Sequence, residues 1–279
     1  MQIILGTAQI GMNYGINNEL GQIPITDVRK LIRIAKDQSI KCIDTAIGYG
    51  SSEKILGESD VQLFNIITKL PLIPDNTKNI KEWVEAQVEG SLKRLKVKKI
   101  YCLFMHYPNQ LMEHYGNELY SSLFNMKKKG VIDNIGISVY DPSELEKILP
   151  IYSIDIVQLP FNLFDRRFYE QGWFDKLSKM NIKIFVRSIF LQGLLLNPNK
   201  IKEKFLPWKN LFSEYHMWLK VNQIIPIEAC IHFIKSYSII NGVIVGVDKS
   251  SHLDQIMKYF KEEKNYVFPI FNFENKDLI

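Results

Sequence analysis

The sequence predicts an α/β fold, and a closed (β/α)8 TIM barrel is the architecture that fits it best. Eight short apolar segments with the character of strands alternate with eight amphipathic segments of helical periodicity, always strand first. Strands in this order pair in parallel through right-handed crossovers, and eight such units close into a barrel. An open doubly wound sheet is the alternative, but Gly6, Gly11 and Gly15 after the first strand lack the spacing of a dinucleotide fingerprint.

The expected strands are short and rich in branched apolar residues. They cover Gln2–Leu5, Cys42–Asp44, Phe64–Thr68, Ile100–Phe104, Asn134–Ile137, Ile156–Leu159, Lys183–Val186 and Gly242–Val245.

The expected helices each carry one apolar stripe. They cover Asp27–Gln38, Ser52–Gly57, Asn79–Leu95, Asn117–Lys129, Pro142–Leu149, Gly172–Met180, Pro226–Ser236 and Ser251–Lys261. Thr26 or Asp27 is the expected cap of the first helix. The fifth opens with Asp141 as cap, a proline in the first turn and an acidic start.

The chain is interpreted as a single barrel domain over residues 1–279, with a long loop after the seventh strand at about residues 190–223. That loop exceeds the usual length of a connection in a barrel, so it is expected to hold function or local helix. No repeat, low-complexity tract or change in composition marks a second domain.

Composition excludes several classes of protein. The chain is 46% hydrophobic and 23% charged, with a net charge of +5. Its basic residues are spread out and are densest at 93–99 and 127–129, which are helix ends rather than a nucleic-acid-binding stripe. Three cysteines without a C-x-x-C give no disulfide framework. With no leader segment and no apolar run of membrane length, a cytoplasmic protein that binds no membrane is expected.

The most informative stretch runs from Cys42 to Glu58, C-I-D-T-A-I-G-Y-G-S-S-E-K-I-L-G-E. Asp44 closes a strand, and Tyr49 follows in a glycine-flanked loop. The stretch resembles the signature of the aldo/keto reductase family, D-T-A-x-x-Y-G-x-S-E-x-x-L-G, and matches it at every specified position. The resemblance extends from L-G-T-A-Q near the start to V-G-V-D-K-S near the end.

Four residues are candidates for catalysis. Asp44, Lys69 and His106 follow the second, third and fourth strands, and the active site of a TIM barrel lies where its strands end. The resemblance implies that these three and Tyr49 surround a substrate carbonyl. Tyr49 would give a proton to the developing alkoxide, and a Lys69 cation held by Asp44 would lower its pKa. His106 would orient the substrate. For each residue considered alone there is a non-catalytic interpretation: Lys69 as a solvated loop lysine, and His106 as a hydrogen-bonded interior histidine.

The resemblance implies a nicotinamide cofactor, with NADPH favoured and NADH possible. The segment R-S-I-F-L-Q-G-L-L resembles the family's loop around the pyrophosphate. The segment V-G-V-D-K-S-S-H-L-D-Q resembles the one that holds the adenosine end, where Lys249 and His252 are candidates for a 2′-phosphate. Ser138 and Gln158 correspond to residues that hold the carboxamide. The expected cofactor-binding residues are Gly6, Thr7, Ser138, Gln158, Arg187, Ser188, Gln192, Gly193, Gly246, Val247, Lys249, His252 and Gln255.

Two positions depart from the family's pattern. Arg187 stands where many relatives have an aromatic residue that stacks on the nicotinamide, and Val139 replaces an asparagine. Arg187 is expected either to stack on the ring or to contact an anionic substrate. The expected substrate-binding residues are Tyr14, Tyr107, Trp208 and Trp218. Aromatic residues and a cation suit a sugar, a sugar nucleotide or another polar carbonyl compound.

The expected function is therefore an NAD(P)H-dependent oxidoreductase that interconverts a carbonyl and an alcohol, on a sugar, a sugar derivative or a small aldehyde. A nicotinamide-binding regulatory subunit is one alternative. A sugar-modifying enzyme with internal hydride return, similar to an epimerase or lyase, is another. No cluster has metal-ligand spacing in the sequence, so no metal is expected. The expected partner is a small molecule, and the expected state is a monomer or a weak homo-oligomer.

Overall fold

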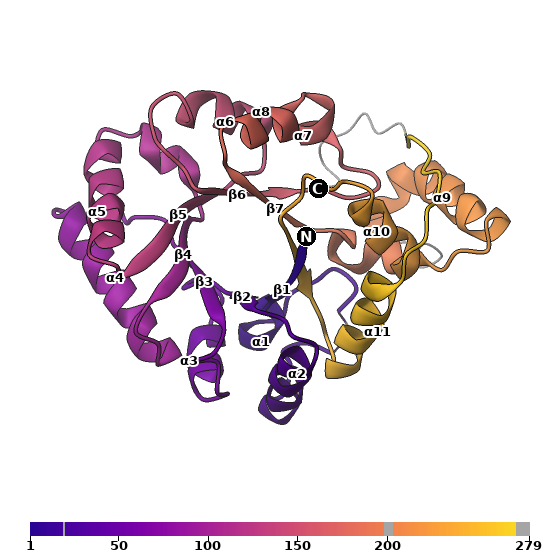
Figure 1. Ribbon diagram of the computed structural model, residues 1–279, viewed down its shortest axis with the longest axis horizontal. Coiled ribbons are helices and arrows are strands. Elements are labelled where there is room, and N and C mark those ends of the chain that lie inside the picture. The colour runs from indigo at the N-terminus through magenta and orange to yellow at the C-terminus, as the bar shows by residue number, and fades with distance from the viewer. Residues whose placement is uncertain (19, 198–202, 272–279) are drawn as a thin grey trace.

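The computed structural model describes residues 1–18, 20–197 and 203–271. Its parallel strands form a closed barrel in sequence order. They are β1 (Gln2–Gly6), β2 (Cys42–Asp44), β3 (Asn65–Leu70), β4 (Ile100–Met105), β5 (Ile132–Ser138), β6 (Ile156–Pro160), β7 (Lys183–Arg187) and β8 (Gly242–Gly246). Pairing of β1 with β8 closes the ring, which Figure 1 shows end-on. The TIM barrel is confirmed, and the open sheet is excluded.

Helices surround the barrel on its outside (Figure 1). The helices that the sequence predicts are α2 (Ile25–Asp37), α3 (Ser52–Gly57), α4 (Ile80–Leu95), α5 (Gly116–Lys128), α6 (Pro142–Ile148), α8 (Trp173–Lys179), α10 (Pro226–Lys235) and α11 (Ser250–Lys261). Further helices, which it does not predict individually, are α1 (Ala8–Gly11), η1 (Pro108–Met112), α7 (Arg167–Glu170), η2 (Leu191–Leu196), η3 (Glu203–Trp208) and α9 (Lys209–Val221).

The long connection after β7 holds local helix, as expected. It contains η2, η3 and α9, and α9 lies at the edge of the molecule, outside α10 (Figure 1). Residues 198–202 of this connection and the C-terminal residues 272–279 lie outside the described residues. The assignment of the whole chain to one domain stays a prediction.

The predicted cap of α2 is wrong, whereas that of α6 is correct. Helix α2 starts at Ile25, so Pro24 occupies the cap position and Asp27 already lies in the first turn. The Asp27 carboxylate instead accepts hydrogen bonds of 3.0 Å from the backbone N–H and the hydroxyl of Ser250, which ties α2 to the start of α11. At α6 the Asp141 side chain accepts from the backbone of Ser143, as the sequence predicts.

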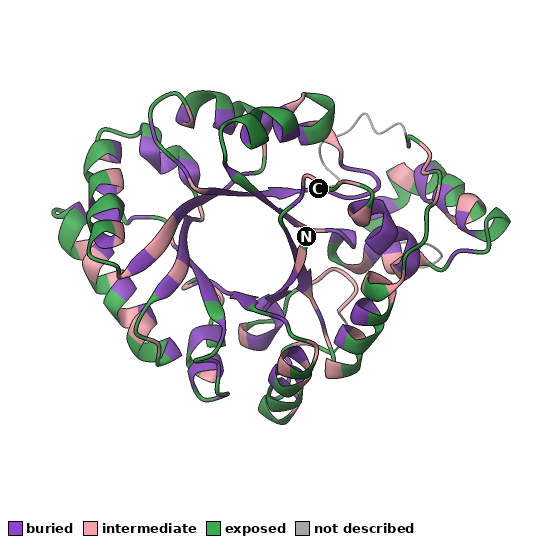
Figure 2. Cartoon of the chain, viewed as in Figure 1, coloured by how far each residue is buried: buried purple, intermediate pink, exposed green. Residues whose placement is uncertain are grey.

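Apolar side chains fill both the inside of the barrel and the layer between strands and helices. The strands are largely buried, and the helices expose one side (Figure 2). The barrel interior is packed by Ile4, Cys42, Ile67, Cys102, Phe104, Ile156, Phe185 and Ile244. Phe104 fits because its neighbour on β5 is a glycine: a Cβ on Gly136 would lie 2.6 Å from the ring. Because these apolar side chains fill the inside of the barrel, polar chemistry is confined to the strand ends.

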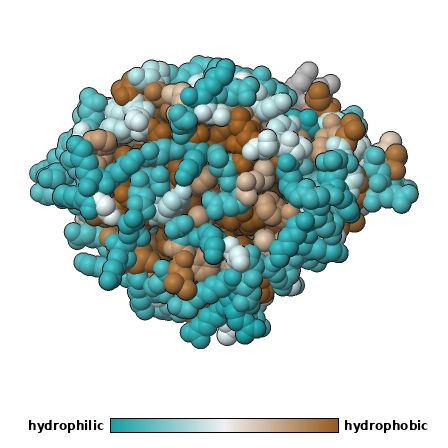
Figure 3. Space-filling view, viewed as in Figure 1, coloured by the Kyte–Doolittle hydropathy of each residue, from teal (hydrophilic) through white to brown (hydrophobic). Residues whose placement is uncertain are grey.

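The surface is consistent with the composition. On the face shown in Figure 3, hydrophilic residues cover the outer helices, and hydrophobic residues gather toward the middle of the ring. Cys42, Cys102 and Cys230 are buried, free thiols. Within the described part of the chain, no helix has both the length and the apolar character of a membrane span.

Candidate active site

A lysine and an aspartate form a buried ion pair at the ends of β2 and β3. The Lys69 Nζ lies 2.6 Å from Oδ2 of Asp44 and also donates to the Thr45 carbonyl oxygen at 2.9 Å. The other carboxylate oxygen of Asp44 accepts a 2.9 Å hydrogen bond from the Gln158 amide on β6. Lys69 and Gln158 are 1% exposed and Asp44 is 3% exposed. These contacts fix the position of the ammonium group.

Tyr49 and His106 lie beside this ion pair. The Lys69 Nζ is 5.0 Å from the centroid of the Tyr49 ring. The same ring meets the His106 imidazole edge-on, with 5.9 Å between centroids. The structure therefore brings together all four residues that the sequence nominates for catalysis.

The phenol of Tyr49 keeps its proton at neutral pH. Burial raises its pKa above the ordinary value, and this outweighs the Lys69 charge, which lowers the pKa. The sequence correctly anticipates the effect of Lys69 but not the net direction, because burial is a tertiary property. Burial opposes charge on Lys69 as well, yet the Asp44 carboxylate holds the Lys69 pKa above its ordinary value. Lys69 is thus a charged ammonium, and Tyr49 beside it is a neutral phenol.

The remaining residues of the signature stretch hold Tyr49 in place. The Ser52 hydroxyl lies 3.0 Å from the Thr45 hydroxyl and donates to the Thr7 carbonyl at 3.1 Å, so it links the ends of β1 and β2. The buried carboxylate of Glu53 accepts from Thr68 on β3 at 2.6 Å. A Cβ on Gly11 would lie only 1.8 Å from the Tyr49 carbonyl oxygen, so only glycine allows α1 to approach this turn.

His106 is neutral at physiological pH. Burial, followed by the positive charges of Lys69 and Arg187, lowers the pKa of His106 to about 4. A neutral imidazole has one N–H donor and one acceptor nitrogen, so it is suited to hydrogen-bond a carbonyl oxygen.

We expect His106 to titrate near pH 4 rather than near its unfolded value of about 6.5. Since its folded pKa is the lower one, the unfolded chain binds more protons between these values. The His106 contribution to stability is therefore complete above about pH 6.5 and falls as the pH drops toward 4. NMR titration of imidazole protons in the wild type and in His106→Gln checks this. A His106 signal with a midpoint near 6.5 would contradict it.

A cavity of about 580 Å³ opens at this cluster; Asp44 and Tyr49 line it, whereas Lys69 and His106 do not. Its lining includes Asp44, Tyr49 and Gln158, and also Asp248 and Lys249 from the segment after β8. Of the expected cofactor-binding residues, those that line it are Gly6, Thr7, Gln158, Arg187, Ser188, Gln192, Gly193, Gly246, Val247, Lys249, His252 and Gln255. Ser138 is not part of the lining; its hydroxyl donates to Oε1 of Gln158 at 3.3 Å.

The loop after β7 has a strained backbone along the cavity. Ser188, Leu191 and Gln192 have φ values of 60°, 47° and 52°, and Gly193 has 89°. Asn17 holds the loop, since its side chain donates to the Gly193 carbonyl at 3.0 Å. Backbone strain of this kind concentrates at functional sites. The sequence carried no signal for Asn17.

The two departures from the family's pattern are in contact with each other. The Arg187 guanidinium donates to the Val139 carbonyl oxygen at 3.1 Å and to the Ser188 hydroxyl at 3.3 Å. The Cζ atom of Arg187 lies 4.1 Å from the centre of the Tyr140 ring. Arg187 is therefore held in position while it lines the cavity. Tyr140, which sequence reasoning missed, has this supporting role.

Only some of the expected substrate-binding residues reach the site. Tyr14 lines the cavity. Tyr107 does not line it, but its ring lies 5.3 Å from that of His106. Trp208 and Trp218 are not brought to the cavity; Trp208 lies against Phe205, at 6.2 Å between ring centroids, and Trp218 stacks on Tyr215 at 6.3 Å. Aromatic packing around α9 explains their positions.

One charged residue of the cavity was missed. Burial raises the pKa of Asp248, while His252 and a hydrogen bond with Gln9 lower it. Asp248 lies in the segment V-G-V-D-K-S, next to Lys249, so its position in the sequence was the available signal.

The chain belongs to the aldo/keto reductase family, whose family model matches residues 2–266. Among proteins with known roles, it is 30% identical over 150 residues to the aldo-keto reductase YhdN of Bacillus subtilis, covering 50% of this chain and 45% of that protein. It is also 30% identical over 153 residues to D-arabinose 1-dehydrogenase of Saccharomyces cerevisiae, covering 50% of this chain and 42% of that protein. The matches thus span less than half the length of these curated relatives.

Solved structures agree on the fold. The aldo-keto reductase AKR11C1 from Bacillus halodurans superposes with a TM-score of 0.78 at 18% identity, over 95% of this chain and 88% of that chain. The glycerol dehydrogenase AKR11B4 from Gluconobacter oxydans gives a TM-score of 0.73 at 20% identity, over 94% of this chain and 87% of that chain.

Proposed function

We propose that this chain is an NAD(P)H-dependent oxidoreductase that interconverts a carbonyl and an alcohol, with Tyr49 as the proton donor. One observation carries the proposal. A neutral phenol lies against a fixed ammonium and a neutral imidazole, next to a cavity whose volume is in the range of small-molecule and cofactor sites. Family membership supports the same reaction class.

The residues along the cavity fit a nicotinamide dinucleotide. The Gln158 amide lines the cavity and offers a hydrogen-bonding group for a carboxamide, and the Ser138 hydroxyl supports it by donating to its Oε1. Gln192 and Lys249 line the cavity, and their side-chain amide and ammonium are donors suited to phosphate. When bound, the cofactor supplies or accepts the hydride at the carbonyl carbon.

The chain's own residues handle the proton and the charge. Hydride addition makes the carbonyl oxygen an alkoxide, and the Tyr49 phenol gives it a proton. The Lys69 ammonium stabilises the tyrosinate that forms, because it remains charged and faces the ring. Asp44 keeps the ammonium in place, and a neutral His106 donates a hydrogen bond to the substrate oxygen. Burial of these groups strengthens each interaction.

The proposed substrate is a sugar, a sugar derivative or a small polar aldehyde. Tyr14 and Arg187 line the cavity and offer hydroxyl and guanidinium groups, which suit a polyhydroxylated compound. Two similar proteins carry names that refer to such compounds, a D-arabinose 1-dehydrogenase and a glycerol dehydrogenase.

The test is an absorbance assay at the reduced-nicotinamide band with aldoses, sugar nucleotides and small aldehydes. Substrate-dependent change in the cofactor, abolished by alteration of Tyr49, is the expected result. Tight cofactor binding with no turnover on any of these compounds would favour a regulatory subunit. Conversion of a sugar without net cofactor change would favour internal hydride return.

We expect Lys249→Met to raise KM for NADPH by about tenfold and to leave KM for NADH nearly unchanged, since one charged contact to a 2′-phosphate is worth about 1.5 kcal/mol or more. Asp248→Asn should lower KM for NADPH, because it removes a carboxylate that repels phosphate. Steady-state kinetics with both cofactors measures these changes. Lys258→Met removes a charge from α11 outside the cavity and is the control. If Lys249→Met changed KM for NADPH and KM for NADH equally, the expected preference for NADPH would be wrong.

A further inference from the structure

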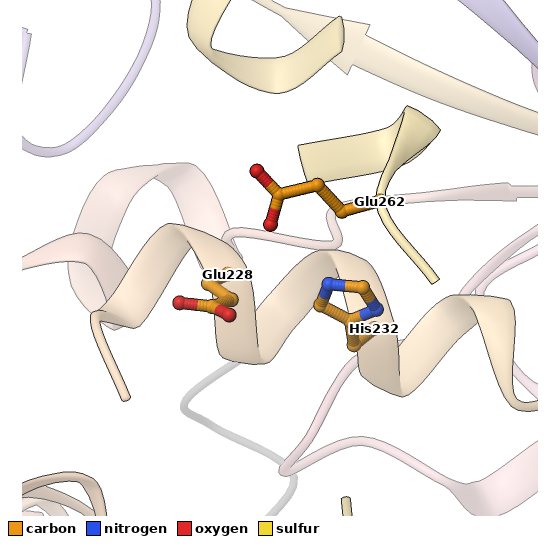
Figure 4. Close-up of side chains that lie close together, drawn as sticks. All are labelled: Glu228, His232 and Glu262. Atoms are coloured by element: carbon orange, nitrogen blue, oxygen red, sulfur yellow. The ribbon is translucent and has the colours of Figure 1, made fainter. Parts of the chain in front are cut away.

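Three potential metal ligands meet between α10 and the end of α11. Glu228 and His232 lie one turn apart on α10, and Glu262 directly follows α11. One donor atom from each lies within 4.8 Å of the others. Figure 4 shows the three side chains clustered in the space between the two helices.

The histidine of this cluster is buried without a partner. His232 is 2% exposed, and neither of its ring nitrogens has a hydrogen-bond partner among the described residues. Leaving a buried polar group unpaired costs free energy, so native structures rarely do so without a reason. Two carboxylates within reach of an unpaired imidazole supply such a reason.

A lysine already places positive charge between the two carboxylates. The Lys264 Nζ lies 2.6 Å from Oε1 of Glu228 and 3.3 Å from Oε2 of Glu262. The Tyr266 hydroxyl also donates to Oε1 of Glu228, at 2.6 Å. The Lys264 side chain is 47% exposed, so its ammonium has access to solvent if another cation takes its place.

We propose that Glu228, His232 and Glu262 form a binding site for a divalent transition metal ion of the zinc class, which displaces the Lys264 ammonium. One imidazole and two carboxylates are a donor set that Zn²⁺ accepts, with a fourth position left for water. Imidazole disfavours Ca²⁺ and Mg²⁺, which prefer oxygen ligands. Bonds of about 2.1 Å require each donor to move inward by about 1 Å.

The site is separate from the candidate active site, and the ion would have a structural role. Glu262 begins the C-terminal segment, in which Phe268 packs on Phe233 of α10 with 5.4 Å between ring centroids. A metal ion shared by α10 and Glu262 would fasten this segment to the helix. From the sequence no metal is expected, because Glu262 is distant in the chain from the two ligands on α10 and meets them only in the folded structure.

Calorimetric titration of the full chain with ZnCl2 tests the proposal, with thermal unfolding as a second readout. The wild type is expected to bind one Zn²⁺ and to unfold at a higher temperature in its presence. His232→Gln and Glu262→Gln should each weaken binding by at least about tenfold, whereas Lys264→Met should strengthen it. His114→Gln removes an exposed histidine elsewhere and should leave binding unchanged. Tetrahedral Co²⁺ absorption in place of zinc would report the donor geometry.

Absence of zinc binding by the wild type would overturn the proposal. Equal zinc affinity of the wild type and Glu262→Gln would also overturn it, because the ion would then be adventitious only. If His232→Gln fails to fold, Glu262→Gln and Lys264→Met decide the outcome, since both side chains are partly exposed. None of these measurements depends on catalytic turnover, so they stand apart from the proposed oxidoreductase function.

Discussion

Replacement of Tyr49 by phenylalanine is expected to lower kcat for carbonyl reduction by about 10²–10⁴-fold. The substitution removes one hydroxyl and keeps the ring, so the edge-on contact with His106 is retained. Without the phenol, the developing alkoxide has no proton donor at this position. Lys69 and Asp44 remain paired, and cofactor binding should be largely unchanged.

Two measurements check this expectation: kcat from the decrease in reduced-nicotinamide absorbance, and the cofactor dissociation constant from fluorescence titration. Tyr169→Phe is a matched control, because Tyr169 is a partly exposed tyrosine on α7 that does not line the cavity. Its kcat should equal that of the wild type. Retained turnover in Tyr49→Phe would exclude the phenol as the proton donor.

Replacement of Lys69 by methionine is expected to damage both activity and stability. It leaves the Asp44 carboxylate buried without its cation, a change that costs about 3–5 kcal/mol of unfolding free energy. It also removes the charge that stabilises a tyrosinate at Tyr49, so kcat should fall by about 100-fold or more. Both effects follow from the same 2.6 Å ion pair.

The double variant Lys69→Met with Asp44→Asn separates the two effects. Since an asparagine carries no charge, the double variant should regain most of the lost stability, while its kcat should stay low. Denaturant unfolding and steady-state kinetics of the wild type, both single variants and the double variant give the coupling energy. A double variant as unstable as Lys69→Met alone would contradict the ion-pair explanation.

The pH dependence of the same pair has a definite sign. The folded pKa of Lys69 is raised above its ordinary value. Its contribution to stability is therefore complete below about pH 10 and is lost as the pH rises through the folded pKa. The stability difference between the wild type and Lys69→Met should shrink in strongly alkaline solution.

Local patterns in the sequence predicted most of the elements that build the site. Alternation of strand and helix periods located all of the strands to within a few residues, because hydrophobic periodicity is a property of short windows. The ends of those strands then indicated Asp44, Lys69 and His106 as neighbours, since parallel strands in a barrel finish on one face. Helix α9 was not predicted as such, because it lies inside a connection of irregular composition.

By itself, the sequence determined the barrel, which follows from periodicity and strand order. It also indicated the four groups at the strand ends, through their positions and through the resemblance to the family's signature. Tertiary structure decided how those groups behave. Burial, which no local pattern reports, raises the pKa of Tyr49 and lowers that of His106. Contacts between distant segments place Arg187 against the Tyr140 ring and Glu262 near His232. Trp218 packs on Tyr215 and so does not reach the cavity. Such proximity depends on how the whole chain packs, and so it becomes visible only in three dimensions.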